Sequence, residues 1–365
     1  MKHGLGFNKR SGLIECFIPQ VKPELLETDF WQEQNNNTST RKEKKMNIKR
    51  LVVALLVGMI LVPISSFAGG NKVVFVIMGL NNPYVSAQAG YTEKWAKKLG
   101  WDYTLFDGEL DPVKNAKYLE DAIQMNPDLI ILMPIDSVAV SSGIRKAHAA
   151  GIPVLMEHMQ AIPEDEKFTI GYTGPGNYVQ GQLVAEMFHK KLNGKGNIVE
   201  VTCVPGQETT IGRHDGFVDR LKELNSGVKL IASNNGDAQV DKTLAVMEDF
   251  LTRFGADGID GIYCCDDTMA VASTIALKEA GLPKGSIPII GVGGSKGGLA
   301  AIKNGAMYGT IVQSPQITQA QTAKIVQKIL DGGLKPPYQF DPYYMYVDHP
   351  KCTKENVEQY LPGDW

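Results

Sequence analysis

Asn81-Asn82-Pro83-Tyr84 follows the apolar run 73–78 and combines amides, a helix start and an aromatic ring. Asn82 precedes a proline at the predicted first helical position, where a capping side chain belongs. Its amide also offers donors and an acceptor to a ligand, so both interpretations of Asn82 stay open. Tyr84, in the first turn, can lay its ring on the apolar face of a sugar.

Glu157-His158 ends a second apolar run, 152–156. A carboxylate accepts hydrogen bonds from two hydroxyls, and a neutral imidazole donates one and accepts one. The pair therefore suits a polyhydroxylated ligand, although loop polarity alone also explains it. No histidine or cysteine after residue 68 has a partner at metal-ligand spacing. We expect no metal and no cofactor.

Asp266-Asp267 stands where the apolar run 259–264 gives way to a helix-length segment. One carboxylate can cap the helix and interact with its dipole, while the other accepts ligand hydroxyls. Paired carboxylates also serve glycoside hydrolysis, which needs them about 5–9 Å apart across a substrate. Sequence does not specify that separation.

Three further polar residues border predicted turns. Arg213 can bind a ligand, or it can pair with Asp215 or another acid on its helix. Gln313 ends a predicted strand directly before Ser314-Pro315, where a planar amide at a crossing between domains can bind hydroxyls. Asp237 follows another strand and joins the candidate set.

Gly293-Gly294-Ser295-Lys296-Gly297 satisfies G-x-S-x-G between a predicted strand and a predicted helix, the setting of a hydrolase nucleophile. His349 is the only later histidine, and no HGGG segment supplies an oxyanion hole. A serine hydrolase using Ser295 is therefore a remote alternative. The other interpretation is a flexible glycine turn that lets a ligand or a second domain approach closely.

Apolar, β-branched runs alternate with longer amphipathic segments. Continuous apolar runs are typical of parallel sheets covered on both faces. The predicted strands form two sets: 73–78, 102–106, 128–133, 152–156 and 168–172, then 197–203, 228–232, 259–264, 287–292 and 308–313. We predict an α/β fold of two doubly wound lobes, whose ligands bind at the carboxyl ends of the strands.

Helix ends are also readable. Asn82, Asp111 and Ser314 each precede a proline and are predicted N-caps. Gly100, Gly151 and Gly281 are predicted to end helices.

The 365 residues leave room for about two domains. A hydrophobic share of 43% supports real cores, and a net charge of −3 argues against a nucleic-acid binder that relies on a basic surface. Five cysteines are too few for a disulfide-dense scaffold. Cys203, Cys264, Cys265 and Cys352 are free thiols, or one disulfide joins Cys203 to a member of the adjacent pair.

Residues 46–68 have the pattern of a signal peptide. Lys49 and Arg50 precede an apolar run, Leu51 to Val62, which is too short to span a bilayer. Small residues predict cleavage after Ala68, and an uncleaved membrane anchor is the alternative. We interpret residues 1–45 as the product of a mis-set start codon, the alternative being a cytoplasmic tail.

Several segments together resemble the ribose-binding branch of the periplasmic solute-binding proteins. They are VFVIMGLNNPYV (74–85), DLIILMPIDSVAV (128–140), AAGIPVLMEH (149–158), GRHDGF (212–217), GIYCCDDTMAVAS (261–273), IPIIGVGGSKGG (287–298) and GTIVQSPQ (309–316). The resemblance implies a type I periplasmic binding protein, in which two Rossmann-like lobes joined by three crossings close on a ligand. Regulators that share these lobes carry an N-terminal helix-turn-helix, where this chain has a signal peptide.

The resemblance supports Asn82 and Tyr84 as ligand contacts, Gln313 as a hinge-side contact, and Asp266 at a position usually filled by Asn. Other positions depart from the family pattern. Glu157-His158 replaces an Asp-Arg pair, Met133 replaces an amide, Ile211 stands where a ligand Arg is usual, and Gly293 replaces an Asp. These departures favour a different sugar, a polyol or a less polar molecule over ribose.

We therefore expect a monomeric periplasmic substrate-binding component of an ABC importer, not an enzyme, that binds a small sugar or polyol between its lobes. Its partner is the membrane permease, with a chemoreceptor or a sensor kinase as further partners and no nucleic acid. The alternative ligand is a furanosyl quorum signal or a nucleoside. The predicted lobes are 72–173 with 314–344, and 174–313 with 345–365. The predicted ligand contacts are Asn82, Tyr84, Glu157, His158, Arg213, Asp237, Asp266 and Gln313.

Overall fold

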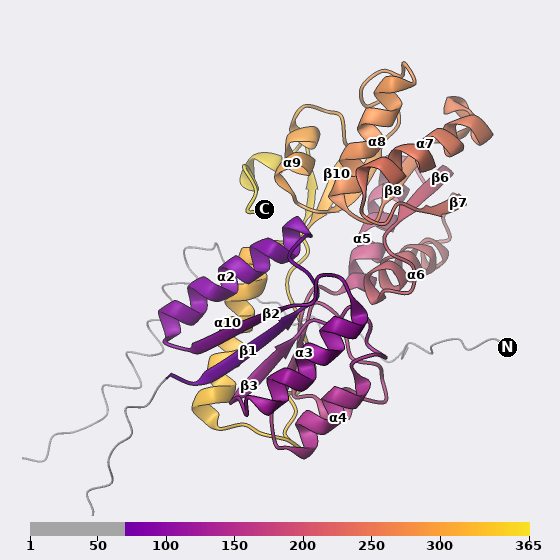
Figure 1. Ribbon diagram of the computed structural model, residues 1–365. Coiled ribbons are helices and arrows are strands. Elements are labelled where there is room, and N and C mark those ends of the chain that lie inside the picture. Colours follow the sequence, from indigo (N-terminus) through magenta and orange to yellow (C-terminus); the bar gives the residue numbers. More distant parts are fainter. Residues whose placement is uncertain (1–69) are drawn as a thin grey trace, which may run out of the picture. The chain divides into compact units, whose positions relative to one another are not determined.

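The computed structural model describes residues 70–365, and the predicted signal peptide and the segment before it lie outside the described residues. This part of the chain contains two sheets of six strands each (Figure 1). The predicted α/β fold with two parallel-sheet lobes is confirmed. Every strand pair recorded in the two sheets is parallel except one, because β12 runs antiparallel to β10.

The first sheet has the order β11-β5-β4-β3-β1-β2. Its strands are β1 (Lys72–Ile77), β2 (Asp102–Asp107), β3 (Leu129–Leu132), β4 (Val154–Glu157), β5 (Gly171–Gly174) and β11 (Tyr344–Tyr346). The strand predicted at 168–172 is placed too early. Glu166–Phe168 forms the short 3-10 helix η2 instead, so β5 begins only after that turn.

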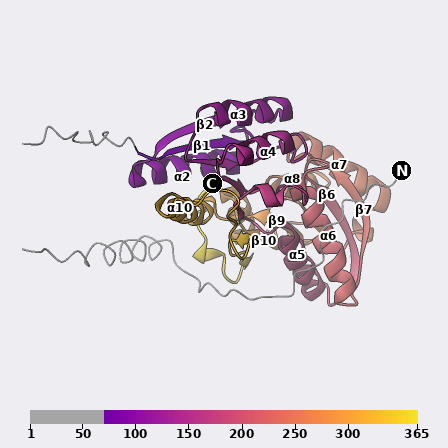
Figure 2. The same cartoon turned by 90° about the horizontal axis from the view of Figure 1, so that it is seen from below.

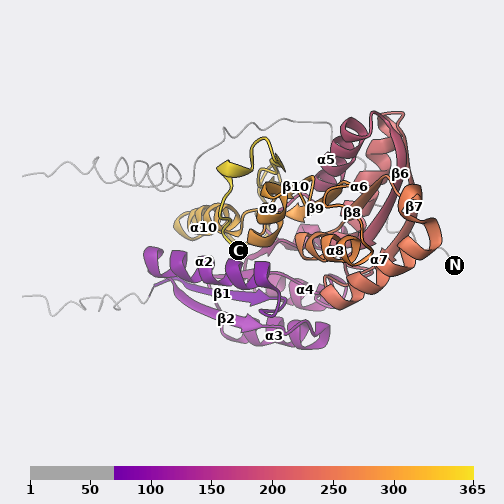
Figure 3. The ribbon, with the colours of Figure 1, turned by 90° about the horizontal axis from the view of Figure 1, so that it is seen from above.

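Helices cover both faces of this sheet. On one face lie α2 (Pro83–Leu99) and α10 (Pro315–Gly332). A hydrogen bond joins the two helices, because Thr92 Oγ1 donates to Gln319 Oε1 at 2.9 Å. On the other lie α3 (Pro112–Gln124) and α4 (Ser141–Ala149), as Figures 2 and 3 show. The buried core under α3 and α4 includes Val74, Val76, Leu119, Ile130, Leu132, Ile144 and Met156.

The second sheet has the order β12-β10-β9-β8-β6-β7. Its strands are β6 (Lys195–Thr202), β7 (Gly227–Asn235), β8 (Gly261–Cys264), β9 (Ile289–Gly293), β10 (Gly309–Val312) and β12 (Lys351–Thr353). The helices around it are α5 (Asn177–Lys191), α6 (Glu208–Glu223), α7 (Val240–Phe254), α8 (Asp267–Glu279) and α9 (Lys296–Lys303), with the short 3-10 helices η3 (Ala256–Gly258) and η4 (Val357–Gln359).

Two cores sandwich this sheet. Buried residues of α5 and α6, such as Phe188 and Phe217, pack on one face. Residues of α7, α8 and α9, such as Phe250, Met269 and Leu299, pack on the other. Burial on both faces explains the continuous apolar strand runs.

The chain passes between the two sheets after β5, after β10 and after β11. Helix α10 therefore packs against α2 of the first sheet although it follows β10 of the second. Residues 345–346 pair with β5 in the first sheet, so that sheet extends past residue 344. These passages place polar side chains from distant segments near one another.

The predicted caps are confirmed. Asn82 accepts from Val85 N, Asp111 from Val113 N, and Ser314 from Ile317 N. Gly100 ends α2 in the left-handed region, at φ 72°. Each cap satisfies an N–H that the helix itself leaves unpaired.

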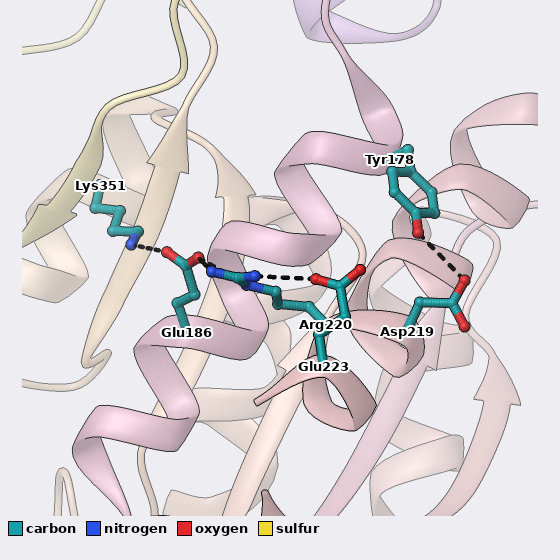
Figure 4. Close-up of polar contacts among 6 residues, drawn as sticks. All are labelled: Tyr178, Glu186, Asp219, Arg220, Glu223 and Lys351. Atoms are coloured by element: carbon teal, nitrogen blue, oxygen red, sulfur yellow. Dashed lines mark hydrogen bonds and ion pairs between the residues drawn. The ribbon is translucent and has the colours of Figure 1, made fainter. Parts of the chain in front are cut away.

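Helices α5 and α6 approach each other at two glycines. A Cβ at Gly181 would lie 2.1 Å from Arg213 O, and one at Gly216 would lie 2.0 Å from Tyr178 O. Figure 4 shows polar contacts beside this packing. Tyr178 donates to Asp219, and Glu186 of α5 accepts hydrogen bonds from Arg220 and from Lys351 of β12. The close approach at Gly181 therefore lies at the backbone of Arg213.

No helix within residues 70–365 combines the length and the apolar composition that a bilayer span requires.

Candidate ligand-binding site

An aromatic cluster lies at the start of α2. The centroid of the Tyr84 ring is 5.3 Å from that of His158 and 5.2 Å from that of Trp365. Tyr84 and His158 are each 6% exposed. Pro83 and the Asn82 cap start α2 and so place Tyr84, while His158 directly follows β4. Three distant parts of the chain therefore meet at one point.

Glu157 lies fully buried beside this cluster. Its Oε1 accepts from Gln88 Nε2 at 2.8 Å and from Gln319 Nε2 at 3.1 Å. Burial raises the pKa of the carboxyl to about 8, and the two amide hydrogen bonds only partly oppose that shift. The group therefore holds its proton at neutral pH and can donate a hydrogen bond as well as accept one.

His158 adopts an unusual backbone conformation, with φ at 63°. Tyr172 Oη lies 3.0 Å from the His158 carbonyl and 2.7 Å from that of Pro175, and it shares its one hydrogen between these two acceptors. Burial, followed by the charge of Arg213, lowers the pKa of the imidazole to about 3. The ring is therefore neutral, with one donor and one acceptor nitrogen.

Polar atoms without partners gather here. Within the described part of the chain, Tyr84 Oη, Glu157 Oε2 and His158 Nδ1 are buried and make no hydrogen bond. Thr318 and Gln313 oppose the burial-induced rise in the pKa of the Tyr84 hydroxyl, but neither completes a hydrogen bond to it. Buried polar groups are normally paired, and an unpaired one costs about 1–3 kcal/mol. The three atoms therefore leave hydrogen-bonding capacity unused beside the aromatic cluster.

Arg213 forms a second buried polar cluster on the side of the other sheet. Its Nε donates to Gln180 Oε1 at 3.0 Å, its Nη2 to Gln313 Oε1 at 3.0 Å, and its Nη1 to Cys265 O at 2.5 Å. Gln180 Nε2 also donates to Gln313 Oε1 at 2.7 Å. The predicted alternative of pairing with Asp215 is wrong, because neutral oxygens of other elements take up the guanidinium.

His349 links this cluster to a passage between the sheets. Its Nε2 accepts from Gly176 N at 2.8 Å, and its Nδ1 lies 3.4 Å from Gln180 Nε2. Burial lowers the pKa of His349 to about 3, so this ring too is neutral. The residue therefore ties the segment before β12 to the start of α5.

Asp266 and Asp267 divide their roles. Asp266 Oδ1 caps α8 by accepting from Met269 N at 2.9 Å, and burial raises its pKa to about 6. Asp267 accepts from Thr310 Oγ1 and Ser295 N and is fully buried within its lobe. Both carboxylates thus have structural partners, and Asp266 is the one that is partly exposed.

Two other predicted contacts have different outcomes. Asn82 Oδ1 caps α2, and the side chain stays partly exposed beside Tyr84. Asp237 lies after the edge strand β7 and bonds Asn235, the last residue of that strand, and Lys242 of α7. The structure therefore does not bring Asp237 to either buried cluster, because its strand lies at the edge of the sheet.

Ser295 is a helix cap. Its Oγ accepts from Gly298 N at 3.0 Å, while His349 bonds Gly176. A Ser–His pair for hydrolysis is thus not assembled, and the G-x-S-x-G match reflects the turn into α9. The part of the chain from residue 70 onward contains no group of three metal-ligating side chains. Its four cysteines are buried free thiols.

Sequence reasoning missed several residues of these clusters. They are the buried residues Gln88, Gln180, Gln319 and His349, and the partly exposed Trp365. Gln88 stands one helical turn after Tyr84, and that spacing is a usable signal. The others come from segments whose neighbours depend on how the chain passes between the sheets.

Curated relatives match along most of their length. The ribose import binding protein of Salmonella typhimurium is 26% identical over 288 residues, covering 79% of this chain and 94% of the relative. That of Bacillus subtilis is 29% identical over 267 residues, covering 72% and 84%. The xylitol-binding protein of Mycolicibacterium smegmatis is 27% identical over 248 residues, covering 68% and 67%.

Solved structures agree in fold. An ABC transporter periplasmic solute-binding protein of Actinobacillus succinogenes with bound D-allose has a TM-score of 0.70 and 25% identity, covering 80% of this chain and all of that one. The Caulobacter myo-inositol binding protein has a TM-score of 0.72 and 23% identity, covering 79% and 95%.

The family described as the periplasmic binding protein domain matches residues 73–334. That span includes both sheets apart from the last two strands, and most of the residues of the two buried clusters. The chain belongs to the periplasmic binding protein domain family.

Proposed function

We propose that this protein is the substrate-binding component of an ABC importer and binds a small sugar or polyol where its two lobes meet. The observation that carries the proposal is the set of buried, unpartnered polar atoms on Tyr84, Glu157 and His158. Hydroxyl groups of a ligand would satisfy all three. Relatives named for ribose and xylitol, and structures with bound D-allose and myo-inositol, support this ligand class.

The proposed binding mode follows from the chemistry of each group. Protonated Glu157 donates to one ligand oxygen, neutral His158 donates or accepts, and the Tyr84 ring covers an apolar ligand face. Arg213 and Gln313 supply hydrogen bonds from the other lobe. Ligand binding favours the closed arrangement because only that state contacts the ligand from both sides.

Asn82 and Asp266 are secondary contacts in this proposal. Each already uses one oxygen as a helix cap, which leaves the remaining polar atom of its side chain for the ligand. Analogues that lack a hydroxyl at one of these contacts would bind more weakly by about 1–3 kcal/mol, because a buried protein group would stay unpaired.

The proposed location is the periplasm, reached through the signal peptide predicted over residues 46–68, with the membrane permease as partner. A chemoreceptor or a sensor kinase is the alternative partner. Family membership supports the transport role, since the relatives are import binding proteins.

Native mass spectrometry of the freshly purified protein tests the proposal. We expect a population carrying one small molecule, released on denaturation and identified by its mass as a sugar or a polyol. A nucleoside or a furanosyl signal would support the alternative ligand. A covalent adduct at Ser295 after treatment with a fluorophosphonate probe would contradict the binding role and favour a hydrolase.

A further inference from the structure

The segment that follows η4 is anchored at several points beside the aromatic cluster. Asp364 Oδ2 accepts from Ser314 Oγ and from Gln316 N, the second at 3.1 Å, at the start of α10. The carbonyl of Trp365 accepts from Lys296 N at 2.9 Å, and its indole Nε1 donates to Gly293 O at 3.3 Å. These contacts fix the backbone and the side chain of Trp365 together.

The indole occupies space that a side chain at position 293 would take. A Cβ built on Gly293 would lie 2.8 Å from Trp365 Cζ2, which is closer than any ordinary contact. Gly293 also has φ at 151°, a conformation that suits glycine. The glycine at the end of β9 therefore makes room for the indole.

Trp365 belongs to the aromatic cluster at the start of α2. Its ring centroid lies 5.2 Å from that of Tyr84, and the two ring planes meet at 83°, an edge-to-face arrangement. In an edge-to-face pair, the partner ring does not cover the faces of the ring that presents its edge. Trp365 is partly exposed, whereas Tyr84 is buried.

We infer that Trp365 is a specificity-determining residue that makes the site prefer cyclic ligands to open-chain polyols. This inference rests on the proposed function. An anchored indole beside the Tyr84 ring forms an apolar wall at a place where the end of β9 offers no side chain. A ring sugar or a cyclitol presents a continuous face of C–H groups to such a wall, whereas an open-chain polyol exposes hydroxyls along its whole length.

The direct experiment compares binding of ring and open-chain ligands by calorimetry. Wild type is titrated with D-allose, D-ribose and myo-inositol, and with allitol and ribitol as open-chain partners. We expect tighter binding of at least one cyclic ligand than of its open-chain partner. Trp365→Ala should weaken binding of the cyclic ligand by about tenfold or more and reduce the preference for the cyclic over the open-chain ligand. Trp365→Phe should retain most of that preference.

Trp101→Phe is the matched control. Trp101 lies at the amino-terminal end of β2 and donates to Gln327 on α10, away from the cluster. Ligand binding should change the tryptophan fluorescence of wild type and of Trp101→Phe. The change in Trp365→Phe should be much smaller. If Trp365→Ala does not fold, two measurements still test the inference: the ligand-induced fluorescence change of Trp365→Phe, and the preference of wild type for cyclic over open-chain ligands.

Three outcomes would overturn the inference. One is an unchanged ligand preference in a folded Trp365→Ala protein. Another is tighter binding of an open-chain polyol by wild type, which would leave the importer function standing. The third is that wild type binds no sugar or polyol of either kind, which would remove the proposed function together with the inference.

Discussion

The Arg213 guanidinium donates to Gln313 Oε1 over 3.0 Å, which joins helix α6 to the residue that directly follows β10. Both residues are at least 95% buried. Directly after Gln313 the chain leaves the second sheet for α10. The contact therefore connects a candidate ligand group to a passage between the lobes.

Arg213→Lys should destabilise the protein by about 2–4 kcal/mol, because a single ammonium cannot reach three acceptors held in a fork. Ligand affinity should fall as well. Urea unfolding measures the free energy, and calorimetry measures the affinity. Arg220→Lys is the control, since Arg220 is a partly exposed ion-pair residue. This substitution should lower the free energy of unfolding by less than about 1 kcal/mol. Equal, small effects at both positions would contradict the role given to Arg213.

Gly181→Ala should destabilise the protein by more than about 1 kcal/mol, because its Cβ would meet Arg213 O at 2.1 Å and push α5 from α6. Gly90→Ala is the matched change in α2, where nothing lies within 4 Å of the new Cβ. That variant should be about 0.5–1 kcal/mol more stable than wild type, as alanine favours helix. Thermal unfolding of the two variants should shift in opposite directions.

Glu157→Gln should remove part of the pH dependence of stability. The folded pKa of Glu157 is raised from 4.5 to about 8, so the folded protein keeps a proton that the unfolded chain has released. The free energy of unfolding therefore falls as pH rises from about 4.5 to about 8. Glutamine can keep the hydrogen bonds from Gln88 and Gln319 without ionising, so the variant should be roughly 4 kcal/mol more stable than wild type at pH 8 and similar near pH 4.5.

Denaturant unfolding at a series of pH values measures this difference. Glu208, whose pKa burial raises to about 7, gives the same sign. The variant should therefore have a reduced slope and not a flat profile. His158 and His349, whose pKa values are lowered to about 3, make the free energy of unfolding rise with pH below about pH 6.5, opposite to the effect of Glu157. Both histidines are present in wild type and in the variant. Parallel profiles would show that Glu157 is ionised in the folded protein.

His158→Asn should fold and bind the preferred ligand about tenfold more weakly. Asparagine tolerates the left-handed backbone at φ 63° better than alanine does, so this variant separates the lost imidazole from backbone strain. His158→Ala should lose affinity too, and about 1 kcal/mol of stability. Wild-type affinity in a folded His158→Asn protein would remove His158 from the site.

Local chemistry allowed much of the fold to be predicted. The Asn82 and Ser314 caps depend on adjacent residues, and the apolar strand runs depend on burial that is continuous along each strand. The prediction starts β5 too early because Phe168 and Ile170 are apolar and continue the strand pattern, although Phe168 ends the 3-10 helix η2 and β5 begins at Gly171.

The site was only partly predictable, for a physical reason. Tyr84 and His158 follow strands, and strand ends share one edge of a sheet. Gln180 and Trp365 reach the clusters because the chain passes several times between two sheets, and no local spacing encodes that proximity. Asp237 has the same strand-end setting as His158, but its strand lies at the sheet edge, away from the clusters.

Calorimetric titration of the purified protein with a panel of sugars and polyols tests the central claim most directly. The panel includes ribose, allose, arabinose, xylitol and myo-inositol. We predict saturable binding of one molecule per chain for at least one member, with a dissociation constant in the micromolar range or tighter. Binding of none of them by folded protein that carries no co-purified ligand would contradict the account of this protein as a sugar or polyol receptor.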